Sequence, residues 1–205
     1  MRGKFVTFEG SEGSGKSTQS RLLAAYLKRK GCRVVYLREP GGTPISERIR
    51  KILLNSKNHS MLAACEMLLY MAARAQVVGQ VIKPALAKGK FVICDRFLDS
   101  TLVYQGYGLG LDIRLIKDIG KFATDGIKPD LTIFLDLAVK KGLLKCGKVK
   151  DRIEKRPLDY HLRVRQGYLK LAAREPGRIK VVKVETDKNS TQNKIRELFT
   201  CRFKI

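Results

Sequence analysis

Histidine, cysteine and long apolar runs are scarce in this chain, and each scarcity excludes a class of protein. The two histidines, His59 and His161, are too few for a histidine-rich metal centre. The five cysteines are scattered without the paired spacing of zinc or redox motifs, so we expect reduced thiols. No apolar run approaches the roughly 20 residues of a membrane span, and the N-terminal run 5–8 is too short for a signal peptide. We therefore expect a cytoplasmic protein with no membrane partner.

Acidic residues are also few. The 205 residues include 19 Asp and Glu against 42 Lys and Arg, which gives a formal net charge of +23 at pH 7. Such a surface attracts polyanions, but no helix-turn-helix, zinc-finger or RNP-type motif accompanies the charge. We expect no specific nucleic-acid partner. With 44% hydrophobic residues the chain is long and apolar enough to fold as a single domain, 1–205, without a linker or an internal repeat.

Short apolar runs alternate along the chain with longer amphipathic stretches. This alternation predicts a three-layer α/β fold, in which helices cover both faces of a parallel sheet. The expected strands are 5–8, 33–37, 91–94, 131–135 and 179–184, and the expected helices are 17–30, 44–54, 61–88, 112–124, 158–174 and 190–201. The one candidate insertion is the polar, lysine-rich segment at about 145–157, which we interpret as a mobile flap.

The strongest local signal is a complete phosphate-binding loop, Gly10-Ser11-Glu12-Gly13-Ser14-Gly15-Lys16-Ser17, followed by Thr18. A predicted strand precedes it and a predicted helix follows, as this motif requires. Its glycines let backbone N–H groups point at phosphate oxygens, and the helix N-terminus adds a positive dipole end. Lys16 can neutralise the β and γ oxygens, and Ser17 can ligate Mg²⁺. The sequence therefore predicts a nucleoside triphosphate site.

Three further segments suggest a second nucleotide beside the first. Arg38 ends the second strand and Asp95-Arg96 end the third, at the carboxyl edge where open α/β sheets bind ligands. Asp95 there can hold Mg²⁺ or its water shell, and the Arg96 fork suits a phosphate. Tyr70 and Arg74 lie one helical turn apart and share a face that suits a planar base.

Taken in order, these motifs resemble those of the bacterial thymidylate kinases, P-loop enzymes that pass the γ-phosphoryl group of ATP to dTMP. The resemblance runs nearly end to end. It rests on the segments 8–18, 38–44, 72–76, 95–97, 99–108 and 129–132 and on Asp151-Arg152-Ile153-Glu154. The family implies a five-stranded parallel sheet of order 2-3-1-4-5 and a homodimer.

The resemblance also assigns roles to individual positions. Glu12 falls where the family reads the sugar 3′-hydroxyl, and Tyr70 falls where it stacks an aromatic ring on thymine. Arg38, Arg50 and Arg96 match the arginines around the dTMP phosphate. The side chains that match the base-reading positions and their neighbours are Arg74, Gln105, Ser100, Thr101 and Tyr104. The expected catalytic set is Lys16, Arg96, Arg152, Asp95 and Glu12, with Mg²⁺ held by Ser17 and Asp95.

The flap departs from the family pattern. Some thymidylate kinases carry an arginine in the phosphate loop where this chain has Gly13, so here the transition-state cation must come from elsewhere. We expect Arg152 to supply it, because its fork can grip two oxygens, whereas Lys145, Lys148 and Lys150 offer only point charges. Two other functions remain open at this point: a kinase for another nucleoside monophosphate, and a basic nucleic-acid-binding ATPase.

Overall fold

The computed structural model describes residues 2–147 and 150–204 of the chain. Five parallel strands form its central sheet: β1 (Lys4–Glu9), β2 (Val34–Arg38), β3 (Phe91–Asp95), β4 (Leu131–Asp136) and β5 (Ile179–Lys183). Their order across the sheet is β2-β3-β1-β4-β5, which confirms the predicted order. The inner strands are buried on both faces, as their continuous apolar sequences require.

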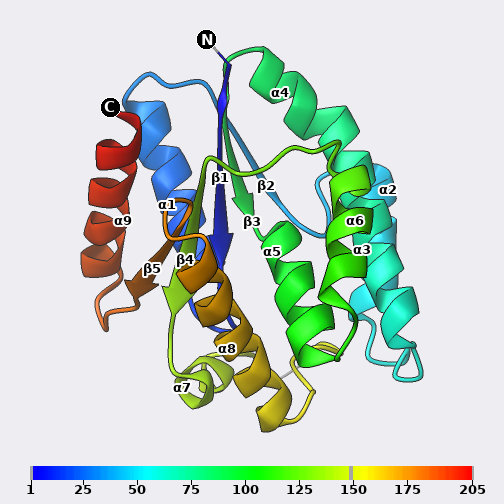
Figure 1. The fold of residues 1–205 in the computed structure, drawn as a ribbon. Helices are drawn as coiled ribbons and strands as arrows, with labels where there is room; N and C mark the ends of the chain where they lie inside the picture. The colour runs from blue at the N-terminus through cyan, green and yellow to red at the C-terminus, as the bar shows by residue number, and fades with distance from the viewer. Residues whose placement is uncertain (1, 148–149, 205) are drawn as a thin grey trace.

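Helices cover both faces of the sheet (Figure 1). One face is covered by α1 (Lys16–Arg29) and α9 (Lys188–Phe203), whose Leu23, Leu27 and Phe199 pack on β1 and β4. The other face is covered by α3 (Ala63–Val77), α4 (Lys83–Ala87), α6 (Ile113–Ala123) and α8 (Leu158–Arg174). The helix α2 (Pro44–Leu54) packs against the layer that contains α3, through the buried Leu53 and through Leu54, and the short helix α7 (Val139–Leu144) follows β4.

The predicted helix 61–88 is present as one continuous helical segment whose helix type changes along its length. The α-helical parts α3 and α4 are joined by a π-helical turn, η1 (Val78–Ile82), whose Val78 and Ile82 are buried against the sheet. Such turns often mark functional sites, because they shift the register of the side chains that follow. None of the described helices is long and apolar enough to cross a membrane.

Two helices of the structure were absent from the sequence-based expectation. One begins as α5 (Leu98–Thr101) and continues as the π-helical η2 (Leu102–Gly108); the other is α7. Nearly all of 98–108 is buried, so this segment has no polar face and no amphipathic period to detect. It carries Ser100, Thr101, Tyr104 and Gln105, and its burial holds these side chains in place.

The strand register brings the functional segments to one edge of the sheet. Asp95 pairs with Phe8 of β1 on one side and with Arg38 of β2 on the other. The segments that follow β1, β2 and β3 therefore leave the sheet at the same level. The strand order also reverses about β1, which is the position where open α/β sheets form a ligand crevice.

Candidate active site

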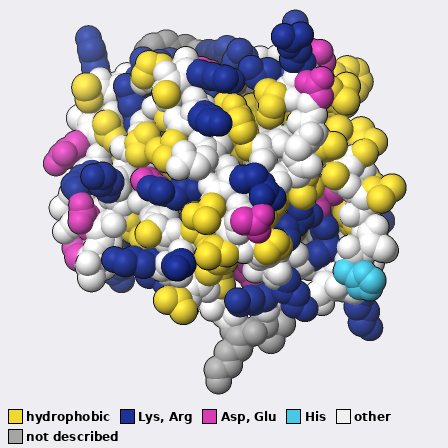
Figure 2. Space-filling view, turned by 60° about the horizontal axis from the view of Figure 1, so that its bottom comes forward, with side chains coloured by type: hydrophobic (Ala, Val, Ile, Leu, Met, Phe, Trp, Pro, Cys, Tyr) yellow, Lys and Arg dark blue, Asp and Glu magenta, His cyan; other side chains and the backbone are white. Residues whose placement is uncertain are grey.

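A cavity of about 680 Å³ opens at this carboxyl edge. It is continuous from the phosphate loop to the helices α3 and η2, so that both expected nucleotide sites share one space. Figure 2 shows this end of the molecule, where Lys and Arg side chains are spread over the surface and outnumber Asp and Glu. The cavity therefore lies in a positive environment that favours anionic ligands.

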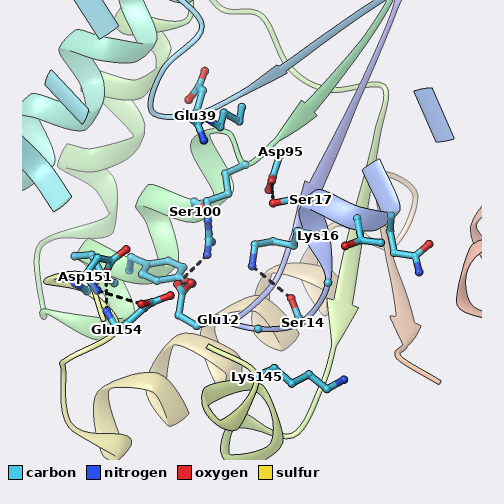
Figure 3. A pocket seen from close by; sticks show the side chains of 18 of the residues that line it. Glu12, Ser14, Lys16, Ser17, Glu39, Asp95, Ser100, Lys145, Asp151 and Glu154 are labelled. Carbon is cyan, nitrogen blue, oxygen red and sulfur yellow. Dashed lines mark hydrogen bonds and ion pairs between the residues drawn. The ribbon is translucent and has the colours of Figure 1, made fainter. Parts of the chain in front are cut away.

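The phosphate loop has the backbone that its glycines were expected to give. Gly13 and Gly15 adopt φ values of +66° and +88°, and α1 begins at Lys16 directly after the loop. The Lys16 ammonium folds back over the loop, donating to the Ser11 carbonyl at 2.7 Å and lying 3.4 Å from Ser14 Oγ (Figure 3). Burial, and then the neighbouring Arg96, lower the pKa of Lys16 to about 8. A phosphate oxygen can replace these weak partners without moving the helix.

A close backbone contact joins the phosphate loop to α7. A Cβ atom added at Gly13 would lie 1.9 Å from the carbonyl oxygen of Gly142, and one added at Gly142 would lie 2.3 Å from the Glu12 carbonyl oxygen. Neither position has space for a side chain. The absence of an arginine at Gly13 is thus matched by the packing of α7 against the loop.

Ser17 and Asp95, the two residues expected to hold a metal, lie side by side. Ser17 Oγ donates a hydrogen bond to Asp95 Oδ2 (Figure 3). Asp95 Oδ1 is buried and has no hydrogen-bond partner among the described residues. A hydroxyl and a carboxylate with a free oxygen are a donor set that fits Mg²⁺.

Glu12, Arg96 and Tyr104 form one hydrogen-bonded group at the centre of the cavity. Arg96 Nη2 donates to Glu12 Oε1 at 2.8 Å, and the Tyr104 hydroxyl donates to the same oxygen at 2.6 Å. Burial alone would raise the pKa of Glu12, but Arg96 and Lys16 outweigh it and lower the pKa to about 2. Arg96 adopts a left-handed φ of +73°, a conformation that costs of order 1–3 kcal/mol and is found mainly at functional sites.

Glu9, at the end of β1, lies beside this group, and the sequence did not predict a role for it. Its carboxylate accepts hydrogen bonds from Phe97 N at 2.8 Å, from Ser100 Oγ at 2.6 Å and from the Tyr168 hydroxyl at 2.7 Å. Burial and the nearby Asp99 raise the pKa of Glu9 to about 7. Glu9 thereby ties the end of β1 to the start of α5. Its sequence signal is weak, because an acidic residue at a strand end is common.

The residues expected around the second nucleotide mostly line the far part of the cavity. These are Arg38, Arg50, Tyr70, Ser100, Thr101 and Gln105. The Arg38 guanidinium is half exposed and lies 3.5 Å from Glu47, whereas Arg50 Nη1 donates to the Pro40 carbonyl at 3.0 Å. Both arginines are thus positioned at the cavity without a strong ionic partner.

Arg74 lies behind the cavity wall rather than in it. It is 1% exposed, and its Nε donates to Glu39 Oε2 at 2.8 Å. Its Nη1 donates to Thr101 Oγ1 at 3.0 Å, and its Nη2 donates to the Phe97 carbonyl at 3.0 Å. In this conformation Arg74 is connected to the cavity through Thr101.

The flap, between α7 and α8, is where the structure differs most from the sequence-based expectation. Arg152 does not face the phosphate loop and is not among the described residues that line the cavity. It is 7% exposed; its Nη1 lies 2.5 Å from Glu66 Oε2, and its Nε donates to the Leu53 carbonyl at 2.8 Å. The physical reason is Glu66, a fully buried carboxylate that requires a cationic partner. Of the three flap lysines compared with Arg152 above, Lys145 lines the cavity, Lys150 is exposed and Lys148 lies outside the described residues.

A third side of the cavity was missed by the sequence reasoning. It is formed by Gln19 and Arg21 of α1 and by the segment that leads from β5 into α9, with Val184, Glu185, Thr186, Lys188 and Thr191. Gln19 Nε2 donates to the Lys188 carbonyl at 2.9 Å, which fixes this segment beside the loop helix. No motif marks these residues, but their position after the last strand of the same sheet edge was a usable signal.

Comparison with known proteins agrees with this geometry. The family model described as thymidylate kinase matches residues 8–195. A thymidylate kinase of Pelotomaculum thermopropionicum is 51% identical over 185 residues, covering 89% of this chain and 86% of the relative. One from Symbiobacterium thermophilum is 49% identical over 195 residues, covering 95% and 91%.

Solved structures lead to the same family. The crystal structure of thymidylate kinase from Ehrlichia chaffeensis superposes with a TM-score of 0.82 at 34% identity, covering 97% of this chain and all of that one. The matching family model, the relatives and the shared fold leave one assignment: this chain belongs to the thymidylate kinase family.

Proposed function

We infer that this chain transfers the γ-phosphoryl group of ATP to dTMP. The observation that carries this inference is the single cavity that joins a phosphate loop to an aromatic and arginine-lined end. Two nucleotides bound there can meet without leaving the protein. Phosphoryl transfer depends on holding donor and acceptor in line and on balancing charge, and this arrangement suits both requirements.

The donor triphosphate is assigned to the loop 10–18, with Lys16 on its β and γ oxygens. The segment 184–186 with Lys188 and Thr191 flanks the same loop, and we assign the base of ATP to this side. Ser17 and Asp95 are the residues that would hold Mg²⁺, which supplies positive charge to the phosphates when it is bound.

The acceptor is assigned to the other end of the cavity. Arg38, Arg50 and Arg96 surround its phosphate, and the Tyr70 ring, half-buried in the cavity wall, stacks on its base. Glu12 accepts from the sugar 3′-hydroxyl, and Gln105 faces the base edge, with Ser100, Thr101 and Tyr104 beside it. Arg74 acts on the base through Thr101 in the conformation described. The acceptor phosphate is already largely deprotonated at neutral pH, so that no general base is required.

The flap is assigned the cation of the transition state. Arg152 was the expected source, but its contacts with Glu66 and Leu53 give it a structural position. We now propose that flap lysines supply the positive charge in the transition state. Among the described residues of the flap, Lys145 is the cationic one that lines the cavity. A lysine gives a point charge where an arginine would give a fork, and a point charge suffices for charge balance.

We also propose a homodimer, as the family implies. Apolar side chains are exposed on the neighbouring helices α3 and α6: Leu68 and Leu115 are about half exposed, and Phe122 is 87% exposed. A patch of this kind marks an interface. The charge change Phe122→Glu should convert the protein to a monomer in sedimentation equilibrium, whereas an unchanged dimer mass would place the interface elsewhere. We further place the protein in the cytoplasm, consistent with its five free cysteines.

The test of the activity is an ADP-release assay with each candidate acceptor. We expect rapid turnover with dTMP and slow turnover with dCMP, dGMP and AMP. Preference for another monophosphate would make the chain a kinase of different specificity. Hydrolysis of ATP that depends on added nucleic acid and falls steeply with salt would instead support a nucleic-acid-binding ATPase.

A further inference from the structure

Glu66 is a buried carboxylate that the proposed mechanism does not use. It lies on α3 and is 0% exposed. Tyr70 and Arg74 follow it at spacings of four and eight residues, so that all three lie on one face of α3, from which Tyr70 lines the cavity. A carboxylate in this position is costly to bury unless it has a structural or functional partner.

The two oxygens of Glu66 have different partners. Oε1 accepts a hydrogen bond from Gln105 Nε2 at 2.7 Å. Oε2 lies 2.5 Å from Arg152 Nη1 and 2.6 Å from Arg156 Nη2. The two guanidinium groups, both from the flap and its junction with α8, compensate the buried charge. Glu66 therefore connects the flap on one oxygen to Gln105 on the other.

This connection decides which end of the Gln105 amide faces the cavity. An ionised carboxylate has no hydrogen to donate, so only the amide nitrogen of Gln105 can bond to it. The amide oxygen must then point to the other side, where Gln105 lines the cavity. Among the described residues the side chain of Gln105 makes its hydrogen bond through Nε2 to Glu66, which leaves Oε1 free to accept from a ligand.

We propose that Glu66 is a positioning residue for base choice. By holding the amide nitrogen of Gln105, Glu66 turns Gln105 Oε1, a hydrogen-bond acceptor, toward the base of the nucleotide that receives the phosphoryl group. Thymine and uracil place an N–H donor at ring position 3, which this oxygen accepts. Cytosine places a lone pair there, so that two acceptors would face each other unpaired. This proposal rests on the assignment of Gln105 to the base edge, and it explains how one neutral side chain discriminates between pyrimidines.

The test is Glu66→Gln, a substitution that keeps the size but adds a donor. The new amide at this position can donate to Gln105 Oε1, so that the amide of Gln105 is free to turn its nitrogen toward the base. We expect the kcat/KM ratio of dTMP over dCMP to fall by about 10-fold or more. The ratio of dTMP over dUMP should not change, because both bases carry the same N–H, and the KM for ATP should not change either.

Three controls separate positioning from a general loss of structure. Glu66→Asp keeps an acceptor-only group and should retain the selectivity against dCMP even if the protein is less stable. Glu175→Gln removes a carboxylate from an arginine pair directly before β5, at the amino edge of the sheet and outside the cavity lining, where Arg178 Nε lies 2.8 Å from Glu175 Oε2, and should leave the selectivity unchanged. In a Gln105→Leu background, Glu66→Gln should have no further effect on selectivity, because the amide through which it acts is gone.

The outcomes are distinguishable. Retained selectivity in folded Glu66→Gln would overturn the proposal, whereas a wild-type enzyme that does not use dTMP would overturn the proposed function itself. If Glu66→Gln does not fold, the wild-type enzyme provides a second test with 3-methyl-dTMP, which lacks the N–H. The affinity of the enzyme for 3-methyl-dTMP should be at least about 10-fold lower than its affinity for dTMP. This difference in affinity should be smaller in the Gln105→Ala variant, which leaves room for the methyl group. Equal binding of the two nucleotides to the wild type would overturn the proposal.

Discussion

The substitution Arg152→Ala distinguishes a structural arginine from a catalytic one. The Arg152 side chain is 7% exposed and makes two strong contacts, with Glu66 Oε2 at 2.5 Å and with the Leu53 carbonyl at 2.8 Å. Removing one partner of a buried ion pair costs about 3–5 kcal/mol. Glu66 keeps Arg156 at 2.6 Å, so we expect the lower end, about 3 kcal/mol of unfolding free energy. In a chain of this length that corresponds to a fall in Tm of roughly 6–12 °C.

The assay compares unfolding and turnover in the same preparation. Urea and thermal unfolding followed by circular dichroism give the stability, and ADP release with saturating dTMP gives kcat at a temperature well below the unfolding transition. We expect Arg152→Ala to lose stability while the folded enzyme keeps kcat within about 10-fold of the wild type. The exposed Lys145→Ala should show the reverse, with stability unchanged to within about 0.5 kcal/mol and a lower kcat.

The opposite result would refute this reasoning. An Arg152→Ala variant with an unchanged unfolding midpoint and a kcat lower by about 10²-fold or more would be the behaviour of an arginine finger. It would mean that Arg152 leaves Glu66 during the catalytic cycle and reaches the transferring phosphoryl group.

Four further predictions concern the centre of the cavity. Because the pKa of Lys16 is lowered to about 8, kcat/KM for ATP should fall as the pH rises above about 8. The Lys16→Ala variant should be slower by orders of magnitude and should not show this fall. A wild-type profile that stays flat to about pH 10 would argue against the assignment of Lys16 to the phosphates of ATP. Glu12→Gln should lose the discrimination between dTMP and its 3′-deoxy analogue, and unchanged discrimination would leave Glu12 only its structural partners, Arg96 and Tyr104. The pKa of Glu12 is depressed to about 2, so its ionised form stabilises the fold above pH 4.5, and the stability gap to Glu12→Gln should close in urea titrations as the pH falls from 4.5 toward 2. Asp95→Asn should raise the Mg²⁺ concentration for half-maximal rate by about 10-fold or more, with a smaller effect of Ser17→Ala, and an unchanged requirement would remove both from the metal site.

The main frame of the fold was predictable because it depends on short-range signals. Five β-rich runs and the phosphate loop mark the strands and the first turn, and the resemblance supplies their order. The segment 98–108 was missed because it is buried on nearly all sides and carries no period. The six residues of α7 were missed because so short a helix has almost no pattern.

The site was predictable where a residue type and its place on the sheet edge decide its role. Lys16, Ser17 and Asp95 meet because two strand ends share one register. Arg152 was assigned to ATP because a polar, basic segment carries no information about which carboxylate its arginine will meet. That carboxylate, Glu66, lies on α3, far from the flap in the sequence, and is identifiable only once the chain is folded.

The backbone contact between Gly13 and Gly142 has a consequence for how the enzyme can vary. The two backbones exclude side chains at both positions, since a Cβ added at Gly13 would lie 1.9 Å from the Gly142 carbonyl oxygen and one added at Gly142 would lie 2.3 Å from the Glu12 carbonyl oxygen. The two positions are therefore a coupled pair, and a loop arginine of the kind found in some relatives cannot be introduced by a single substitution here. It requires α7 to retreat, and because the flap follows directly after α7 ends at Leu144, the flap would be displaced at the same time. Chimeras that exchange the phosphate loop alone should be inactive, whereas those that exchange the loop together with α7 and the flap should retain function.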